Sequence, residues 1–217
     1  VKGQIVVSGA YAVTIKNIDI TYTTTGANDA AVLATTAGNS VAIDDVTFTV
    51  NANGGGSAIY VSGSDASVSD SVINVTADGA TNTVRAIRAL EGTELIVENT
   101  EMTVTATNVT EVQAIRGGAS DIKISGSTVT VNATNADDSS DLAYGIVFFG
   151  AMNETDAQAS GASANYKKLD VKDTSVTMNG DGTFSELTAI SGNGSSTYHG
   201  TAITITDSTI TSDALGI

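Results

Sequence analysis

Apolar and polar residues alternate along most of this chain in short runs, which glycine, asparagine or aspartate residues separate. Residues 112–131, VQAIRGGASDIKISGSTVTV, contain a short apolar run, a glycine corner, an alternating run, a second corner at Gly126 and another alternating run. Alternation at a period of two is typical of a strand with one buried face, and glycine permits the backbone angles of a tight corner. This stretch therefore predicts three strands joined by two corners.

The middle strand of this unit recurs along the whole chain. Its equivalent inward residues are Ile15, Ile43, Val68, Val97, Ile124, Val171 and Ile205, which are 28, 25, 29, 27, 47 and 34 residues apart. The first strand gives an independent check, because its central apolar residue always follows alanine or glycine. The small residues are Ala31, Ala58, Ala86, Ala114, Gly145, Ala189 and Ala214, and the apolar residues after them are Val32, Ile59, Ile87, Ile115, Ile146, Ile190 and Leu215. Agreement between two columns makes an accidental period improbable.

A fixed period in this range is typical of a solenoid, in which each coil buries its apolar face by stacking on its neighbours. We therefore expect an all-β fold, a single-stranded right-handed parallel β-helix of about seven coils with three strands each. It forms one domain over residues 1–217, with insertions at 151–168 and 192–201. A leucine-rich repeat would need leucine columns, whereas valine and isoleucine dominate here. A β-sandwich would not require every third strand to resemble the others.

The excess of acidic over basic residues narrows the range of binding partners that we expect. The chain has 24 acidic and 9 basic residues, a net charge of −15 and a pI near 4.1, so nucleic acid and anionic membrane surfaces are disfavoured. It has no cysteine, which excludes disulfides and thiol chemistry. No apolar stretch approaches the ~20 residues that span a bilayer. The repeat begins at once and ends within a coil without polar caps, so we expect a fragment of a longer solenoid or a subunit that stacks end to end.

One polar column follows the middle strand at its corner. Its members are Asn17, Asp45, Asp70, Asn99, Gly126, Asp173 and Asp207. These residue types tolerate left-handed backbone angles, so the column predicts a ladder of turns. Calcium held between stacked carboxylates is the alternative, although the glycine-rich nonapeptide of calcium-binding β-rolls is missing.

Two further polar columns lie on the outside of the third strand. The first contains Asp19, Thr47, Val72, Glu101, Thr128, Ser175 and Thr209, and the second contains Thr21, Thr49, Asn74, Thr103, Thr130, Thr177 and Thr211. Paired threonines on a flat solenoid face are similar to those of ice-binding proteins. Asp19, Val72 and Glu101 interrupt the first column, and threonine is in any case favoured on exposed strands.

A pair of arginine residues lies on the outer side of the first strand of the repeat. Arg88 and Arg116 take equivalent places in adjacent coils, next to Tyr60 one coil earlier. Two guanidinium groups about 5 Å apart repel by roughly 0.8 kcal/mol in water-like dielectric, and we expect nearby Glu91, Glu94 and Glu111 to offset this repulsion. A solvated ion-pair cluster explains these residues structurally. The functional hypothesis is a grip on a carboxylated sugar.

The two insertions carry the remaining candidate binding residues. The first contains Tyr166, and the second contains Tyr198 and His199, the only histidine. Aromatic side chains on loops above a rigid scaffold can stack on sugar rings. An acidic run of Asp137, Asp138 and Asp141 is a weak calcium candidate, with solvation as its default interpretation. No residue pattern calls for a cofactor, and no catalytic group is assigned.

The strings IKISGSTVTV and ITITDSTITS resemble the repeats of autotransporter passenger domains of the pertactin-like and self-associating types. The resemblance is one of repeat style over nearly the whole chain. It implies an extracellular or cell-surface right-handed β-helix that acts as an adhesin or binds copies of itself, laterally or end to end. Cell-surface glycans or proteins are further partners that it implies, without membrane insertion by this segment.

Two other functions remain open from sequence. A polysaccharide lyase or hydrolase of the pectin-degrading type would need clustered carboxylates beside a basic residue in one groove. Arg88 and Arg116 near Glu91 come closest to such a cluster. Ice binding through the threonine columns is the third hypothesis.

Overall fold

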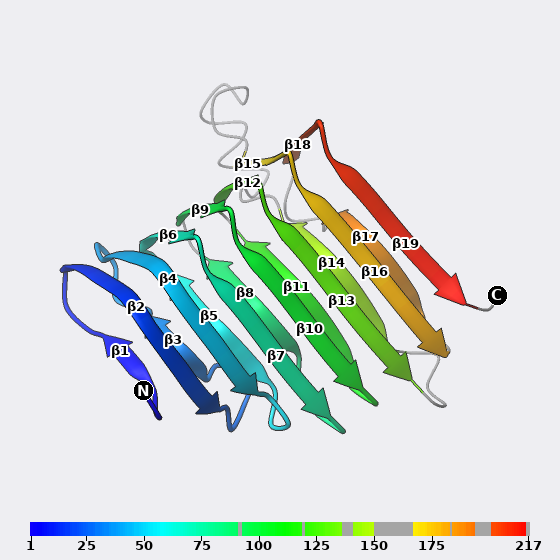
Figure 1. Cartoon of the computed structure of the whole chain (residues 1–217), viewed down its shortest axis with the longest axis horizontal. Helices are drawn as coiled ribbons and strands as arrows, with labels where there is room; N and C mark the ends of the chain where they lie inside the picture. The colour runs from blue at the N-terminus through cyan, green and yellow to red at the C-terminus, as the bar shows by residue number, and fades with distance from the viewer. Residues whose placement is uncertain are drawn as a thin grey trace, which may run out of the picture.

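The computed structural model describes residues 1–90, 93–118, 120–135, 141–149, 167–182, 184–193 and 201–215. In Figure 1 the strands form two layers, with long strands in front and a second sheet behind them. All pairings between these strands are parallel. Within the described ranges, no helix is long and apolar enough to cross a bilayer. The chain is therefore an all-β parallel solenoid, as the repeat predicts.

The two layers correspond to different parts of the repeat. The first strands of the repeats form a sheet of β1 (Ile5–Val7), β3 (Ala30–Ala34), β5 (Gly56–Ser62), β8 (Val84–Leu90), β11 (Glu111–Gly118), β14 (Leu142–Phe149) and β17 (Glu186–Asn193). We call it the rear sheet. The second and third strands form the front sheet, which contains β2 (Ala12–Thr23), β4 (Ser40–Asn51), β6 (Asp65–Ser69), β7 (Val72–Asp78), β9 (Glu94–Glu98), β10 (Glu101–Thr107), β12 (Asp121–Ser125), β13 (Thr128–Asn135), β15 (Lys167–Lys172), β16 (Ser175–Gly182), β18 (Thr201–Thr206) and β19 (Thr209–Leu215).

The solenoid has about five turns, and the prediction of seven is wrong. Turns of three separate strands begin at β5, whereas the first two repeats run through their second corner as the single long strands β2 and β4. The residues after those corners are Ile18 and Val46, which pair directly with each other. Later coils have serine or threonine there, and the hydroxyl groups of Ser71, Ser127, Thr174 and Ser208 each accept a hydrogen bond from a backbone N–H of the preceding coil. Because this backbone N–H then bonds a hydroxyl group and not a backbone carbonyl, the hydrogen-bond ladder between the strands is interrupted, and the long strand is divided in two.

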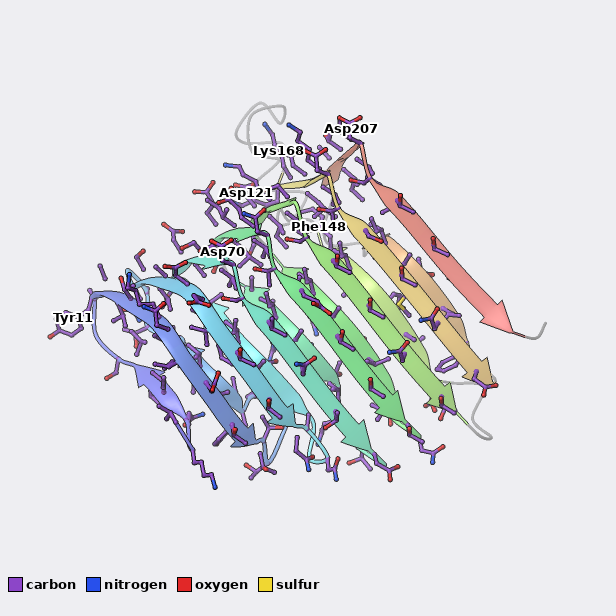
Figure 2. All side chains as sticks on the ribbon, in the orientation of Figure 1. Tyr11, Asp70, Asp121, Phe148, Lys168 and Asp207 are labelled. Atoms are coloured by element: carbon purple, nitrogen blue, oxygen red, sulfur yellow. The ribbon has the colours of Figure 1, made fainter. Side chains whose placement is uncertain are left out.

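The register confirms the inward columns. Ile15, Ile43, Val68, Val97, Ile124, Val171 and Ile205 are successive Cα partners. In the long strands, Ile20, Phe48, Ile73, Met102, Val129 and Val176 stack in the same way. From Ile20 to Val176, all of this second column is fully buried in one continuous core. Phe148 of the rear sheet is also fully buried in this core (Figure 2).

The small-residue column of the rear sheet faces this core. A Cβ added to Gly145 would lie 2.4 Å from the Ala189 carbonyl oxygen and 2.8 Å from Cγ1 of Val176 in the front sheet. The next residue, Ile146, is buried in the core as well. Two successive inward positions break the period-two alternation, so the outward residues of these strands are three apart instead of two.

The corner column is a ladder of left-handed turns. Its seven residues, Asn17, Asp45, Asp70, Asn99, Gly126, Asp173 and Asp207, all have φ between 47° and 58°. Figure 2 shows Asp70 and Asp207 on the ridge where short and long strands of the front sheet meet. Backbone N–H groups on this ridge donate to the next coil, for example from Asn99 to the Ser125 carbonyl oxygen at 3.0 Å. The predicted turn ladder is confirmed in each coil.

A column of buried hydroxyl groups lies directly behind these corners. It contains Ser71, Thr100, Ser127, Thr174 and the less buried Ser208. Ser127 Oγ donates to the Ser125 carbonyl oxygen at 2.9 Å and accepts from the Thr100 backbone N–H at 3.1 Å. Thr174 and Ser208 repeat this arrangement. These hydroxyl groups satisfy backbone groups that the corner removes from the ladder.

Candidate functional site

The outer side of the rear sheet carries two neighbouring columns of side chains. The first column contains Ala30, Ser57, Arg85, Gln113, Tyr144 and Thr188, and the second contains Leu33, Tyr60, Arg88, Arg116, Val147 and Ser191. Ala30, Tyr144 and Val147 are buried but do not belong to the continuous core. They therefore pack on the outside of the coil, against other side chains of these two columns.

All three arginines of the chain lie in these two columns. Arg85 and Arg88 are on β8, and Arg116 is the Cα partner of Arg88 on β11. The predicted neighbourhood of Arg88, Arg116 and Tyr60 is confirmed, since Tyr60 on β5 is the Cα partner of Arg88 on its other side. The Arg88 guanidinium lies over the Tyr60 ring, 4.3 Å from its centroid. This geometry fits a cation–π contact.

Arg85 is linked to a carboxylate through the neutral amide of Gln113 and not by a direct ion pair. Its Nε donates to Gln113 Oε1 at 2.7 Å, and Gln113 Nε2 donates to Glu111 Oε1 at 2.6 Å. Thr83 Oγ1 occupies the other Glu111 oxygen at 2.7 Å. Arg85 is only 3% exposed. A buried guanidinium is thus connected to Glu111 only through the neutral amide of Gln113.

Arg88 reaches across the sheet to the loop before β3. Its Nη1 donates to Asn28 Oδ1 at 2.6 Å and to the Ala27 carbonyl oxygen at 3.3 Å. These acceptors are neutral, as Gln113 is for Arg85. In the described part of the chain, the ion pairs involve lysines, and neither Arg85 nor Arg88 takes part in one.

Burial and mutual repulsion lower the pKa values of Arg85 and Arg116. Burial, together with the charges of Arg116 and Arg88, lowers the pKa of Arg85 to about 9. Burial and the Arg88 charge likewise lower the pKa of Arg116, and Glu111 opposes both shifts. Of the carboxylates expected to balance these arginines, Glu94 instead pairs with Lys123 at 2.6 Å, and Glu91 lies outside the described residues. Among the described carboxylates, Glu111 is the one whose charge opposes the pKa shifts of Arg85 and Arg116.

Tyr144 and Glu186 extend the same face toward the C-terminal end. The Tyr144 hydroxyl donates to Glu186 Oε2 at 2.8 Å, and Tyr144 is 4% exposed. Burial and this hydrogen bond raise the pKa of Tyr144. The roles of Arg85, Gln113, Tyr144 and Glu186 are not apparent from period-two alternation. The signal that could have revealed them is the small inward residue, which shifts the outward positions.

The front sheet offers a second candidate surface on its seven long strands. The register confirms the two predicted polar columns, which begin at Asp19 and Thr21. It adds a third column of Thr23, Asn51, Thr76, Thr105, Asn132, Asn179 and Asp213. We call these three columns the threonine face. Each column crosses from strand to strand over the seven long strands, which are the long front arrows of Figure 1.

The candidate calcium ligands are Asp137, Asp138 and Asp141, of which the structure describes Asp141. Across the described ranges, no group of three histidine, aspartate or glutamate residues is placed to hold a metal ion. Asp141 is 6% exposed, and its Oδ2 accepts a hydrogen bond from Asn135. Asp137 and Asp138 lie outside the described residues, as do the candidate binding residues Tyr166, Tyr198 and His199.

No protein family model, curated protein or solved structure matches this chain significantly. Its class is therefore defined by the fold, a parallel β-solenoid with an arginine cluster on one outer side and a threonine face on the other.

Proposed function

We propose that this chain is a non-catalytic extracellular surface protein that associates with copies of itself through the threonine face. The observation that carries the proposal is the composition of that face. Among its 21 register positions, twelve are threonine, four asparagine and one serine, with Asp19, Glu101 and Asp213 as the acidic residues and Val72 as the apolar one. The resemblance of the repeats to self-associating passenger domains supports the same role and the surface location.

Charge explains why this face suits self-association. Two copies of a chain with net charge −15 repel each other over most of their surfaces. The threonine face carries few of those charges, so contact there involves the least repulsion. A surface that binds its own copy must also be self-complementary. Threonine and asparagine side chains both donate and accept hydrogen bonds, so either can face its own kind.

The size of the face predicts a weak contact. Seven strands about 4.8 Å apart and three columns about 6.7 Å apart give roughly 500 Å² per copy. A dimer would bury roughly 1,000 Å² in total, at the lower end of specific interfaces. We therefore expect a dissociation constant on the order of 100 μM in solution, strengthened by avidity when many copies share one cell surface.

Sedimentation velocity over a concentration series tests the proposal. The expected result is a monomer–dimer equilibrium that strengthens with added salt, because salt screens the repulsion between acidic copies. Thr130→Glu puts a charge in the middle of the face and should weaken association by at least about tenfold. Ser67→Glu adds the same charge on β6, outside the face, and serves as the matched control.

A protein that stays monomeric up to about 1 mM in high salt would exclude this function, because even the weakest class of specific interface forms at that concentration. Equal weakening by Thr130→Glu and Ser67→Glu would show that net charge, and not the threonine face, controls association.

A further inference from the structure

The two outer columns of the rear sheet contain buried donors that have no acceptor among the described residues. Within that part of the chain, Arg85 Nη1, Arg88 Nε and Ser57 Oγ are each buried without a hydrogen-bond partner. Ser57 and Arg85 are Cα partners on adjacent strands, and Arg88 is three residues beyond Arg85 on β8. Ser57 is 1% exposed and Arg85 is 3% exposed. Buried polar groups are usually paired, so three unpaired donors at neighbouring positions call for an explanation.

The same place concentrates positive charge on a strongly acidic chain. Among the described carboxylates, Glu111 opposes the charges of Arg85 and Arg116, and its two oxygens accept hydrogen bonds from Thr83 and Gln113. Arg85 and Arg88 donate to neutral oxygens, which belong to Gln113, Asn28 and Ala27. Burial, and after it the charges of Arg116 and Arg88, lower the pKa of Arg85, so the positive charges here are destabilised by desolvation and by one another. An anion would relieve both the repulsion and the unpaired donors.

We propose that the arginine cluster of Arg85, Arg88 and Arg116, together with Ser57, binds the carboxylate of a small acidic molecule. Arg88 and Arg116 are partly exposed and can meet a ligand from solvent, whereas Arg85 and Ser57 are buried at neighbouring register positions. The planar fork of a guanidinium matches a carboxylate in a bidentate manner. The net charge of −15 excludes long polyanions, which the rest of the surface repels.

The carboxylate has two chemical sources, a uronic acid sugar or a simple organic acid. Tyr60 and Asn28 beside Arg88 provide an aromatic ring and a polar side chain that a sugar can use. This site is on the rear sheet, so it is independent of self-association through the threonine face.

Titration with D-glucuronate, D-glucose and acetate at low ionic strength tests the site. The chain has three arginines in total, so an NMR spectrum of side-chain Nε–H groups holds one signal for each. We expect glucuronate to shift the Arg85 and Arg88 signals saturably, and glucose to bind at least about tenfold more weakly. If acetate binds as tightly as glucuronate, the carboxylate comes from a simple organic acid. If acetate binds about tenfold more weakly, the ligand is a sugar acid.

Matched variants separate the site from general charge effects. Arg88→Gln should weaken glucuronate binding by at least about tenfold, since it removes a charged donor. Lys16→Gln removes one positive charge from an exposed residue of β2 and should change affinity by less than about twofold. If Arg88→Gln does not fold, the shifts of the arginine Nε–H signals in the wild-type protein still test the proposal.

The proposal is overturned if glucuronate leaves the arginine signals unmoved, or if sodium chloride at equal ionic strength moves them equally. It is also overturned if glucose binds as well as glucuronate, or if Lys16→Gln weakens binding as much as Arg88→Gln. None of these outcomes depends on dimer formation, and Thr130→Glu should bind glucuronate normally.

Discussion

At the ridge of the front sheet, one residue in each coil holds a left-handed backbone conformation. Asn99 has φ of 48°, and its Nδ2 donates to Asp70 Oδ1 at 3.3 Å. Ordinary L-residues are strained in this region by about 1–2 kcal/mol, whereas glycine is not. Asn99→Ala should therefore lower the free energy of unfolding by about 1–2 kcal/mol, and Asn99→Gly by less than about half of that. Urea denaturation of both variants measures the difference, and equal losses would contradict the role of φ.

Tyr144 gives a pH-dependent prediction at the same scale. The pKa of its phenol is raised above the ordinary value of 10.0 by burial and by the bond to Glu186. The unfolded chain therefore releases this proton first as pH rises, and the stabilisation is complete below about pH 10 and is lost above it. Tyr144→Phe should be less stable than the wild type at neutral pH by about 1 kcal/mol.

This difference should shrink once the pH exceeds about 10, because only the wild type loses the phenol's contribution. Urea unfolding of both proteins across that range measures it. A gap that stays constant through about pH 11 would show that the phenol is not held neutral by the fold.

Between strands, the buried hydroxyl column is the element that completes each corner. Ser127 is 3% exposed and makes two hydrogen bonds to backbone groups. Ser127→Ala leaves the Thr100 N–H without that acceptor and should cost about 1–3 kcal/mol of unfolding free energy. Ser67→Ala, at a partly exposed position on β6, should change stability by less than about 0.5 kcal/mol. Similar effects for both variants would mean that the column does not support the corners.

The columns that could be predicted are those that obey one rule of spacing. Ile43 and Ile124 alternate with polar neighbours and recur at a fixed period, so their stacking follows from sequence. The strand number at the N-terminal end could not be predicted in the same way. It depends on whether the residue after the corner has a hydroxyl group, as Ser71 has and Val46 lacks.

The arginine cluster could be predicted only in part. The sequence predicts Arg88 and Arg116 as neighbours because they take the same place in adjacent coils. It does not predict Arg85 beside them, because period-two alternation puts residues 85 and 88 on opposite faces. In the structure, two successive inward residues, Ala86 and Ile87, bring both arginines outside. Which donors lack a partner depends on side-chain packing, so no sequence pattern could reveal it.

For the whole molecule, stability depends on stacking, and position along the solenoid should decide the effect of a core substitution. Ile124 in a central coil is 1% exposed, and Ile205 in the same column on β18 is 46% exposed. Ile124→Ala should cost about 2–5 kcal/mol of unfolding free energy, and Ile205→Ala less than about 1 kcal/mol. Urea denaturation compares the two variants, and equal costs would argue against a stacked core.

Methyl NOE spectroscopy tests the stacking itself most directly. A sample with labelled isoleucine and valine methyl groups should give cross-peaks from Val68 to Val97, from Val97 to Ile124 and from Ile124 to Val171, each one coil apart. Cross-peaks that instead join these residues to unrelated positions, or backbone contacts typical of antiparallel strands, would contradict the solenoid and both surfaces described on it.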